Sequence, residues 1–300
     1  MSLLASPVRL AKREKVTYVK GKTKAVYRGA GLVAPSYDGE AFAASGLPDT
    51  SRPYTVLGVE TSCDDTAAAV VRSDGIILGE AVASQHEVHA AYGGVVPGLA
   101  KNAHEAAIDG VVRQALENAG LRDVRDVDAV AATVGPGLEI CLRVGARAAA
   151  RLASEHAKPF LHAHHLEAHC LVARLPGGGG GADDDAAPAF PFLALLVSGG
   201  HCQLLWVRGV GACEVLGGTL DDALGEAYDK AARMLGLSGP TGGGPALERA
   251  AVAGNATAVP LPIPMRQKKT CDFSYAGLKN ALRGQVAAAR ERLGLADDAP

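Results

Sequence analysis

The chain has 300 residues, 48% of them hydrophobic and 21% charged, which is ordinary for a globular protein of about two domains. A formal net charge of −2 excludes a global electrostatic attraction for nucleic acid, so an RNA substrate would need a local basic patch or a partner protein. The six cysteines form no C-x-x-C pair and no run reaches about 18 apolar residues, which argues against a zinc ribbon, a disulfide framework and a membrane span.

Residues 1–53 are predicted to be a basic leader. Between positions 9 and 28 the chain carries eight Lys and Arg residues but a single acid, Glu14. A basic, acid-poor start that contains serine is typical of organelle transit peptides, and the apolar run of a secretory signal is missing. We predict a mitochondrial transit peptide, with a chloroplast transit peptide or a disordered tail as the alternatives.

Residues 54–174 are predicted to form a first lobe in which strands and helices alternate. Alternating apolar residues favour strands, and apolar residues at helical spacing favour helices. The predicted strands and turns cover 54–71, 75–84 and 128–138, and the predicted helices cover about 99–119 and 144–156, with a further helix after 158–165.

A second lobe is predicted at residues 191–300, after a Gly- and Asp-rich flexible insertion at 175–190. Residues 191–207 repeat the scheme that opens the first lobe, which is an apolar strand, a small polar turn and a second apolar strand. Two such openings predict two related lobes, and the alternation of strands with helices predicts an α/β fold.

The first polar turn contains Glu60, Thr61, Ser62 and Asp64. Its backbone N–H groups and hydroxyls suit a phosphate, and its carboxylates suit the metal ion of that phosphate. A plain polar hairpin loop is the alternative.

The second polar turn is Ser198–His201, where two glycines allow the backbone to approach a ligand closely. A tight turn without a ligand would look similar. Two such turns facing each other across a cleft would form the phosphate grip of the actin, sugar-kinase and Hsp70 superfamily.

His165 and His169 are four residues apart, so on a helix both imidazoles lie on one face and can reach one metal ion. Two structural histidines are the alternative. Glu167 lies about 200° around the helix from His165, so it cannot serve as the base that follows the first His in an H-E-x-x-H zinc protease.

A fourth pattern joins the acids of Gly225–Lys230 to a glycine-rich loop at Gly242–Pro245. A carboxylate beside glycines suits a ribose and base pocket, because the carboxylate accepts ribose hydroxyls and the glycines admit the nucleoside. The alternative is a helix surface charge and a linker.

These patterns belong to an ordered series of seven motifs that resembles the TsaD family, also called Gcp or O-sialoglycoprotein endopeptidase-like. The resemblance runs from about Tyr54 to Arg283, and the basic leader makes the organellar branch the nearest fit. The motifs are Glu60–Thr66, Gly93–Pro97, Gly135–Leu138, His165–His169, Leu196–His201, Leu220–Lys230 and Asp272–Lys279.

The resemblance implies a two-lobed fold of the actin-like ATPase (ASKHA, RNase H-like) superfamily. It implies transfer of threonylcarbamoyl from threonylcarbamoyl-AMP to N6 of the adenosine next to the anticodon, in tRNAs that read codons beginning with A. The partners it implies are tRNA, a threonylcarbamoyl-AMP synthase and a second copy of the chain. The adenylate is an activated anhydride, so positioning and charge stabilisation suffice and no protein nucleophile is demanded.

The resemblance also implies the site residues. His165 and His169 match the family's ligands for one divalent metal ion of the iron or zinc class. The positions that match the family's adenylate-binding residues are Leu196, Val197, Ser198, Gly199, Gly200, Asp229 and Gly244. Glu248 matches a position that lines the same pocket in some members.

The chain departs from the family at its end. Family members continue past the position of Pro300 to an Asp-Asn motif whose Asp is the third metal ligand. The second lobe is therefore expected to be incomplete, and the chain is expected to be a fragment or inactive by itself.

Three other functions remain open. An ATPase or small-molecule kinase of the same superfamily would use the two phosphate-type turns but would not need the histidine pair. A metalloprotease would fit the old family name, although Glu167 is misplaced for it. A truncated, non-catalytic homologue would bind nucleotide or pair with a complete relative.

Overall fold

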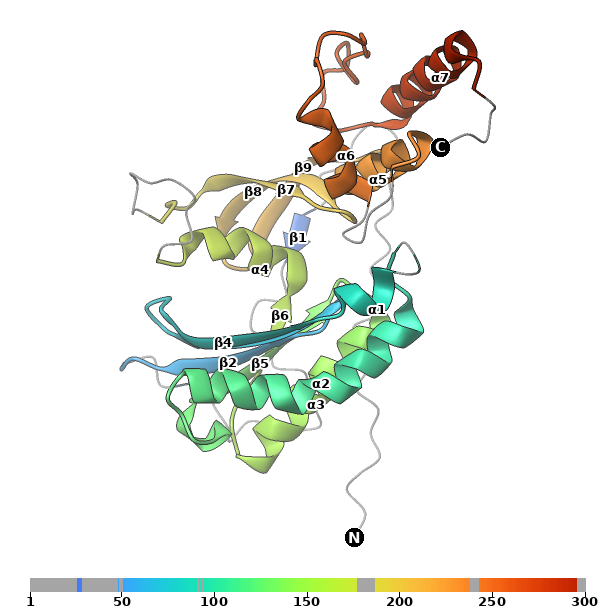
Figure 1. Cartoon of the computed structure of the whole chain (residues 1–300). Helices are drawn as coiled ribbons and strands as arrows, with labels where there is room; N and C mark the ends of the chain where they lie inside the picture. Colours follow the sequence, from blue (N-terminus) through green and yellow to red (C-terminus); the bar gives the residue numbers. More distant parts are fainter. Residues whose placement is uncertain are drawn as a thin grey trace.

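The computed structural model describes residues 51–90, 94–176, 187–237 and 243–295, together with Pro48, Tyr92 and a short strand at Val26–Arg28. Two β-sheets lie one above the other, and a short helix lies between them (Figure 1). Helices cover the outer face of the first sheet. No helix in these described ranges is long and apolar enough to cross a membrane.

The first sheet has five strands in the order β4-β3-β2-β5-β6. β2, β3 and β4 form an antiparallel meander, and β5 and β6 run parallel to β2. Parallel neighbours need a crossover, and helices make both crossovers here. This order and these directions are those of an actin-like lobe, so the predicted α/β class is confirmed. The strands are β2 (Thr55–Glu60), β3 (Asp65–Arg72), β4 (Ile77–Ser84), β5 (Ala129–Gly135) and β6 (Phe160–His164).

One face of this sheet is covered by the helices α2 (Pro97–Asn118) and α3 (Glu139–Glu155). The buried residues of α2 recur every three or four positions and meet Leu57, Val59 and Val70 of the strands in the main core. The helices α1 (His86–Ala90) and η1 (Val124–Asp126) connect these elements. Because the core occupies only this face, the opposite face is left open toward the second sheet.

The second sheet has the order β1-β9-β8-β7, with antiparallel pairing throughout. The strands β7 (Phe192–Val197), β8 (Cys202–Gly209) and β9 (Ala212–Gly218) repeat the meander of the first sheet. The sequence predicted the hairpin β7–β8 but not β9. β7 pairs with β8 alone among the described strands, so its other edge carries no described partner.

The strand β1 (Val26–Arg28) lies inside the predicted leader, and the sequence analysis placed no element there. It pairs with β9, where Tyr27 is opposite Cys213. Three residues are too few to show a strand period, and backbone pairing at a sheet edge demands no particular side chains.

The remaining helices lie beside the second sheet or beyond one of its ends (Figure 1). α4 (His165–Leu171) and η2 (Val172–Arg174) follow β6, and α4 lies between the two sheets (Figure 1). Cys170 of α4 packs against Leu205, Val207 and Cys213 in a smaller core. α5 (Leu224–Met234), α6 (Gly243–Ala251) and α7 (Ala276–Leu293) come after β9. Of the predicted 175–190 insertion, residues 177–186 lie outside the described residues.

Asp128, at the start of β5, provides a prediction on pH-dependent stability. Its carboxylate accepts hydrogen bonds from the Thr55 N–H at 2.8 Å and from Arg52 at 2.8 Å. Burial alone would raise the pKa of Asp128, but these hydrogen bonds outweigh it and hold the pKa below its ordinary value. Asp128→Asn is therefore expected to lower the free energy of unfolding by about 1 kcal/mol at pH 7.

The expected loss depends on pH because the folded-state pKa is the lower one. The stabilisation is fully present above the ordinary carboxyl pKa of 3.8 and disappears as the pH falls through the folded-state value. Urea unfolding of both proteins at pH 7 and near pH 3 measures this. Asp109→Asn is the matched control, because Asp109 pairs with Arg151 on the surface and should cost little. If the difference in free energy of unfolding between the wild type and Asp128→Asn were larger near pH 3 than at pH 7, the stabilising role of the Asp128 carboxylate would be contradicted.

Candidate functional site

A cavity of about 660 Å³ lies on the open face of the first sheet. Strands β2, β3 and β5 line it, together with the turn after β2 and the helix α4. Its volume falls within the range of about 300–1,000 Å³ that is usual for small-molecule sites. Most of the residues predicted from the first turn and the histidine motif line it together, namely Glu60, Ser62, Asp64, His165 and His169.

Glu60 ends β2 and anchors the first turn. Its carboxylate accepts the Ser62 N–H and lies 3.5 Å from Nδ1 of His165. Burial would raise the pKa of Glu60, but hydrogen bonds from His165, Ser62 and Thr133 lower it to about 2. Glu60 is therefore a carboxylate at neutral pH, held beside Nδ1 of the His165 ring.

His165 and His169 form an adjacent pair, as the helical spacing predicted. Their ring centroids are 4.5 Å apart with the ring planes at 90°. Nδ1 of His165 is also 3.2 Å from Oγ of Ser62. Since Glu60 and Ser62 engage Nδ1, Nε2 of His165 is the nitrogen left for a ligand. Burial, and then the neighbouring His165, lowers the pKa of His169, which favours the neutral ring that a metal requires.

This donor set fits a metal ion in part. A carboxylate on the far nitrogen of a ligating imidazole is the usual support for a metal-binding histidine, and Glu60 occupies that position for His165. Within the described ranges, no group of three His, Cys, Asp or Glu side chains is arranged to hold a metal. The described residues therefore offer two ligands.

Thr61 corrects the expectation that the whole turn faces the ligand. Its side chain is buried, its hydroxyl donates to the Cys141 carbonyl at 2.9 Å, and it accepts the Gly145 N–H at 3.1 Å. Successive side chains of an extended segment point to opposite faces. Glu60 and Ser62 therefore face the cavity while Thr61 faces α3.

His104 of α2 supports the same turn from the core, and the sequence analysis did not single it out. It is fully buried, with Nδ1 2.7 Å from Oγ1 of Thr66 and Nε2 3.1 Å from the Cys63 carbonyl. Because a carbonyl only accepts, Nε2 carries the proton and Nδ1 accepts from the Thr66 hydroxyl. The only sequence signal is a lone histidine on the apolar face of a helix.

We expect His104→Ala to lower the free energy of unfolding by about 2–4 kcal/mol, because it leaves a cavity and removes the partner of the buried Thr66 hydroxyl and of the Cys63 carbonyl. Chemical denaturation measures the loss. His86→Ala is the matched control, since His86 is exposed and should change stability by less than about 0.5 kcal/mol. Equal effects of the two substitutions would show that His104 does not support the turn.

The second turn, Ser198–His201, is closed by its own backbone. The Ser198 N–H donates to the His201 carbonyl at 2.8 Å, and Oγ of Ser198 accepts the N–H groups of Gly200 and His201 at 3.2 and 2.9 Å. Space beside Gly199 and Gly200 is open, so a ligand can approach their backbone. Leu196, by contrast, packs against the smaller core, and Val197 is 47% exposed.

The charges of the histidine pair act on the second turn. Burial lowers the pKa of His201, and the nearby His165 and His169 lower it further. On its other side the turn meets α5, where the Gly225 N–H donates to the Ser198 carbonyl at 3.2 Å. A backbone hydrogen bond therefore joins the turn to α5, and neither element is among those that line the cavity of about 660 Å³.

Asp229 and Gly244 also meet, although the predicted glycine loop is wrong in part. Gly243 and Gly244 form the first turn of α6, and Gly242 lies outside the described residues. The Gly244 N–H donates to Oδ1 of Asp229 at 2.9 Å, so the carboxylate satisfies a free N–H group at the start of the helix. Glu248 is exposed one turn further along α6.

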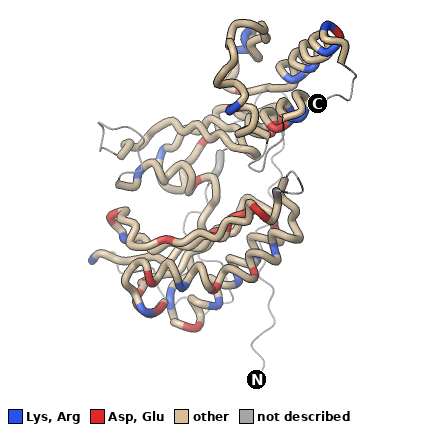
Figure 2. The backbone as a smooth tube through the Cα atoms, in the orientation of Figure 1, with Lys and Arg blue, Asp and Glu red and all other residues tan. Residues whose placement is uncertain are grey.

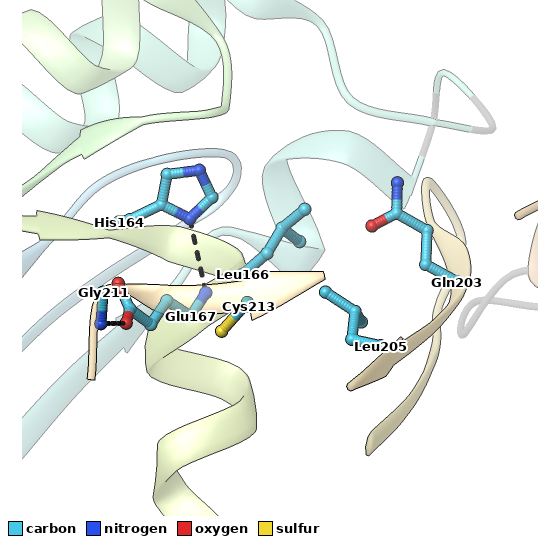
Figure 3. Close-up of a pocket in the computed structure, with 7 residues that line it drawn as sticks. All are labelled: His164, Leu166, Glu167, Gln203, Leu205, Gly211 and Cys213. Carbon is cyan, nitrogen blue, oxygen red and sulfur yellow. Dashed lines mark hydrogen bonds between the residues drawn. The ribbon is translucent and has the colours of Figure 1, made fainter. Parts of the chain in front are cut away.

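A second, much smaller cavity lies between α4 and the second sheet (Figure 3). Its volume of about 20 Å³ is far too small for a nucleotide. Oε1 of Glu167 accepts the Gly211 N–H at its edge, so Glu167 engages the second sheet and not the histidine pair. This position weighs against the metalloprotease alternative.

Charges of both signs are interspersed over the first lobe (Figure 2), in agreement with the small net charge. Recognition of a charged ligand at this site therefore depends on the groups that line it and not on the electrostatic field of the whole protein.

Three comparisons with known proteins bear on these residues. Residues 76–296 match the family model described as TsaD, tRNA N6-adenosine threonylcarbamoyltransferase. A probable mitochondrial tRNA N6-adenosine threonylcarbamoyltransferase of Arabidopsis thaliana is 48% identical over 249 residues, which cover 81% of this chain and 50% of the relative. The tRNA N6-adenosine threonylcarbamoyltransferase of Granulibacter bethesdensis is 52% identical over 78% of this chain and 63% of its own length.

The chain thus spans about half to two thirds of the length of these relatives. Among solved structures, component A of (R)-2-hydroxyglutaryl-CoA dehydratase from Acidaminococcus fermentans aligns over 81% of this chain and 70% of its own, with 12% identity and a TM-score of 0.39. A score of this size gives no basis for transferring a function.

Proposed function

The chain belongs to the TsaD family of tRNA N6-adenosine threonylcarbamoyltransferases, and we propose that it binds threonylcarbamoyl-AMP and takes part in transfer of the threonylcarbamoyl group to tRNA. The acceptor is N6 of the adenosine next to the anticodon, in tRNAs that read codons beginning with A. The observation that carries the proposal is the meeting of Glu60, His165 and His169 in one cavity.

The proposed roles follow from the groups that each residue offers. Ser198, Gly199 and Gly200 give a backbone turn that suits the phosphate of the adenylate, and the first turn of α5 adds N–H groups beside it. Asp229 and Gly244, with Glu248 one helical turn away, suit the ribose and base. Because the donor is already activated, these groups need only hold it in line with the acceptor nitrogen.

His165 and His169 are proposed as two ligands of one divalent metal ion of the iron or zinc class. When bound, such an ion would supply Lewis-acid polarisation of the donor. Glu60 and Ser62 orient His165 for this role through its Nδ1. The described part of the chain supplies no third ligand beside them.

The proposal is tested by incubating the purified chain with threonylcarbamoyl-AMP and matching tRNA, and by measuring threonylcarbamoyladenosine by mass spectrometry of the nucleosides. The full-length Granulibacter relative serves as the positive control, and a threonylcarbamoyl-AMP synthase maintains the donor. Product from the control but neither product nor AMP binding from this chain would refute the proposal. Phosphate release from ATP without tRNA would favour the ATPase alternative.

Mitochondrial location and a homodimer are further parts of the proposal. The location is supported by the basic leader 1–53 and by the mitochondrial label of the Arabidopsis relative. Residues 1–53 fused to a fluorescent protein should co-localise with a mitochondrial marker, and plastid import would favour the alternative.

A further inference from the structure

The motif Asp272–Lys279 has no role in the site as described so far, yet it packs against the end of β9. The Phe273 N–H donates to the Gly218 carbonyl at 3.0 Å, and the Leu220 N–H donates to the Phe273 carbonyl at 2.9 Å. A Cβ atom on Gly217 would lie 2.1 Å from the Cys271 carbonyl oxygen, so the two backbones approach as closely as glycine permits. The motif is therefore fixed to the sheet that carries the second turn.

Two adjacent carboxylates tie this motif to α5. Asp221 accepts the Ser274 hydroxyl at 2.6 Å and the Tyr275 N–H at 2.7 Å. Asp222 bridges Lys230 of α5, at 2.8 Å, and Lys279 of α7. Asp222 and Lys279 are 13% and 19% exposed, so solvent screens this bridge less than it would a surface pair.

The same motif reaches the second turn from two sides. On one side, α5 begins against the turn, because a Cβ atom on Gly225 would lie 2.8 Å from Cα of Gly199. On the other side, the Tyr275 hydroxyl lies 3.4 Å from Sγ of the buried Cys202, directly after the turn. Burial, and then Cys202, raises the pKa of Tyr275 to about 12, so the phenol keeps its proton.

We propose that Asp221, Asp222 and Tyr275 are positioning residues, which brace α5 and β8 so that the turn Ser198–His201 holds the geometry needed for the adenylate donor. This proposal rests on the proposed function. Apart from α7, which carries Lys279, the brace contacts the end of β9, α5 and the residue that follows the second turn, and α5 and the turn belong to the proposed donor site. It should therefore alter donor binding without altering the affinity for tRNA.

The test compares Asp222→Asn and Tyr275→Phe with the wild type. Asp222→Asn keeps the shape of the side chain but leaves Lys279 without its countercharge and Lys230 with Glu226 alone. Tyr275→Phe removes only the contact with Cys202. We expect the donor KM and the Kd for AMP to rise about tenfold in Asp222→Asn and about threefold in Tyr275→Phe. The KM for tRNA should stay within about twofold of the wild-type value.

Arg143→Gln is the matched control, because Arg143 forms an exposed pair with Glu139 at 2.6 Å on α3 of the first lobe. A merely structural role would lower the melting temperature and move both KM values together, and that result would overturn the brace. If both variants bound AMP as tightly as the wild type does, the brace would also be overturned, while the proposed function would stay intact. Wild-type protein that binds no AMP would overturn the two proposals together. Tyr275→Phe keeps the test decisive if Asp222→Asn fails to fold.

Discussion

Replacing His169 by alanine is expected to lower the affinity for Fe²⁺ or Zn²⁺ by more than about a hundredfold, and threonylcarbamoyl transfer with it. Loss of a ligand costs more than the 10–100-fold typical of a lost supporting contact. His169 is the better choice for this test, because His165 also contacts Glu60 and Ser62, and its removal would disturb the first turn as well. Metal content after gel filtration, and chelator competition, measure the affinity without reference to activity.

Two further variants grade the effect. Glu60→Gln keeps an oxygen that can accept from Nδ1 of His165 but removes the charge, so its metal affinity should fall by about 10–100-fold. Glu139→Gln removes an exposed carboxylate on α3 and should leave metal binding unchanged. The metal affinity is therefore expected to decrease from the wild type to Glu60→Gln and further to His169→Ala. If a folded His169→Ala protein still bound a full equivalent of metal, His165 and His169 would not be the metal ligands.

The sequence predicted those parts of the site that depend on local periodicity. The strand that precedes Glu60, and the helix that places His165 and His169 on one face, follow from repeats of two and of about 3.6 residues. The repeated hairpins β2–β3 and β7–β8 follow from the same alternation, whereas β9 was not predicted.

The parts that were missed depend on contacts between distant segments. His104 meets Thr66 from 38 residues away, and Asp221 meets Ser274 from 53 residues away. No local pattern encodes such pairs, because the helix that carries His104 is specified by its apolar residues alone. The composition of the turn predicts Thr61 at the ligand, but the turn continues the alternation of β2, which places the Thr61 side chain on the face opposite to Glu60 and Ser62.

Gly225→Ala is expected to raise the donor KM by about a hundredfold. An added Cβ would lie 2.8 Å from Cα and 3.0 Å from N of Gly199, and 3.2 Å from the Ser198 carbonyl oxygen. These are backbone atoms, which cannot rotate aside as a flexible side chain would. Either α5 or the second turn must shift, and a displacement of about 1 Å at a substrate-positioning group is enough for a loss of this size.

Gly277→Ala in α7 is the matched control, because nothing lies within 4 Å of the added Cβ there. Alanine in place of glycine inside a helix is neutral or stabilising by up to about 1 kcal/mol, so this variant should keep its donor KM and melt no earlier than the wild type. Gly225→Ala should also lose about 1–3 kcal/mol of stability from overpacking. Because that loss is moderate, the folded variant remains measurable, and an unchanged donor KM would show that the start of α5 does not set the geometry of the turn.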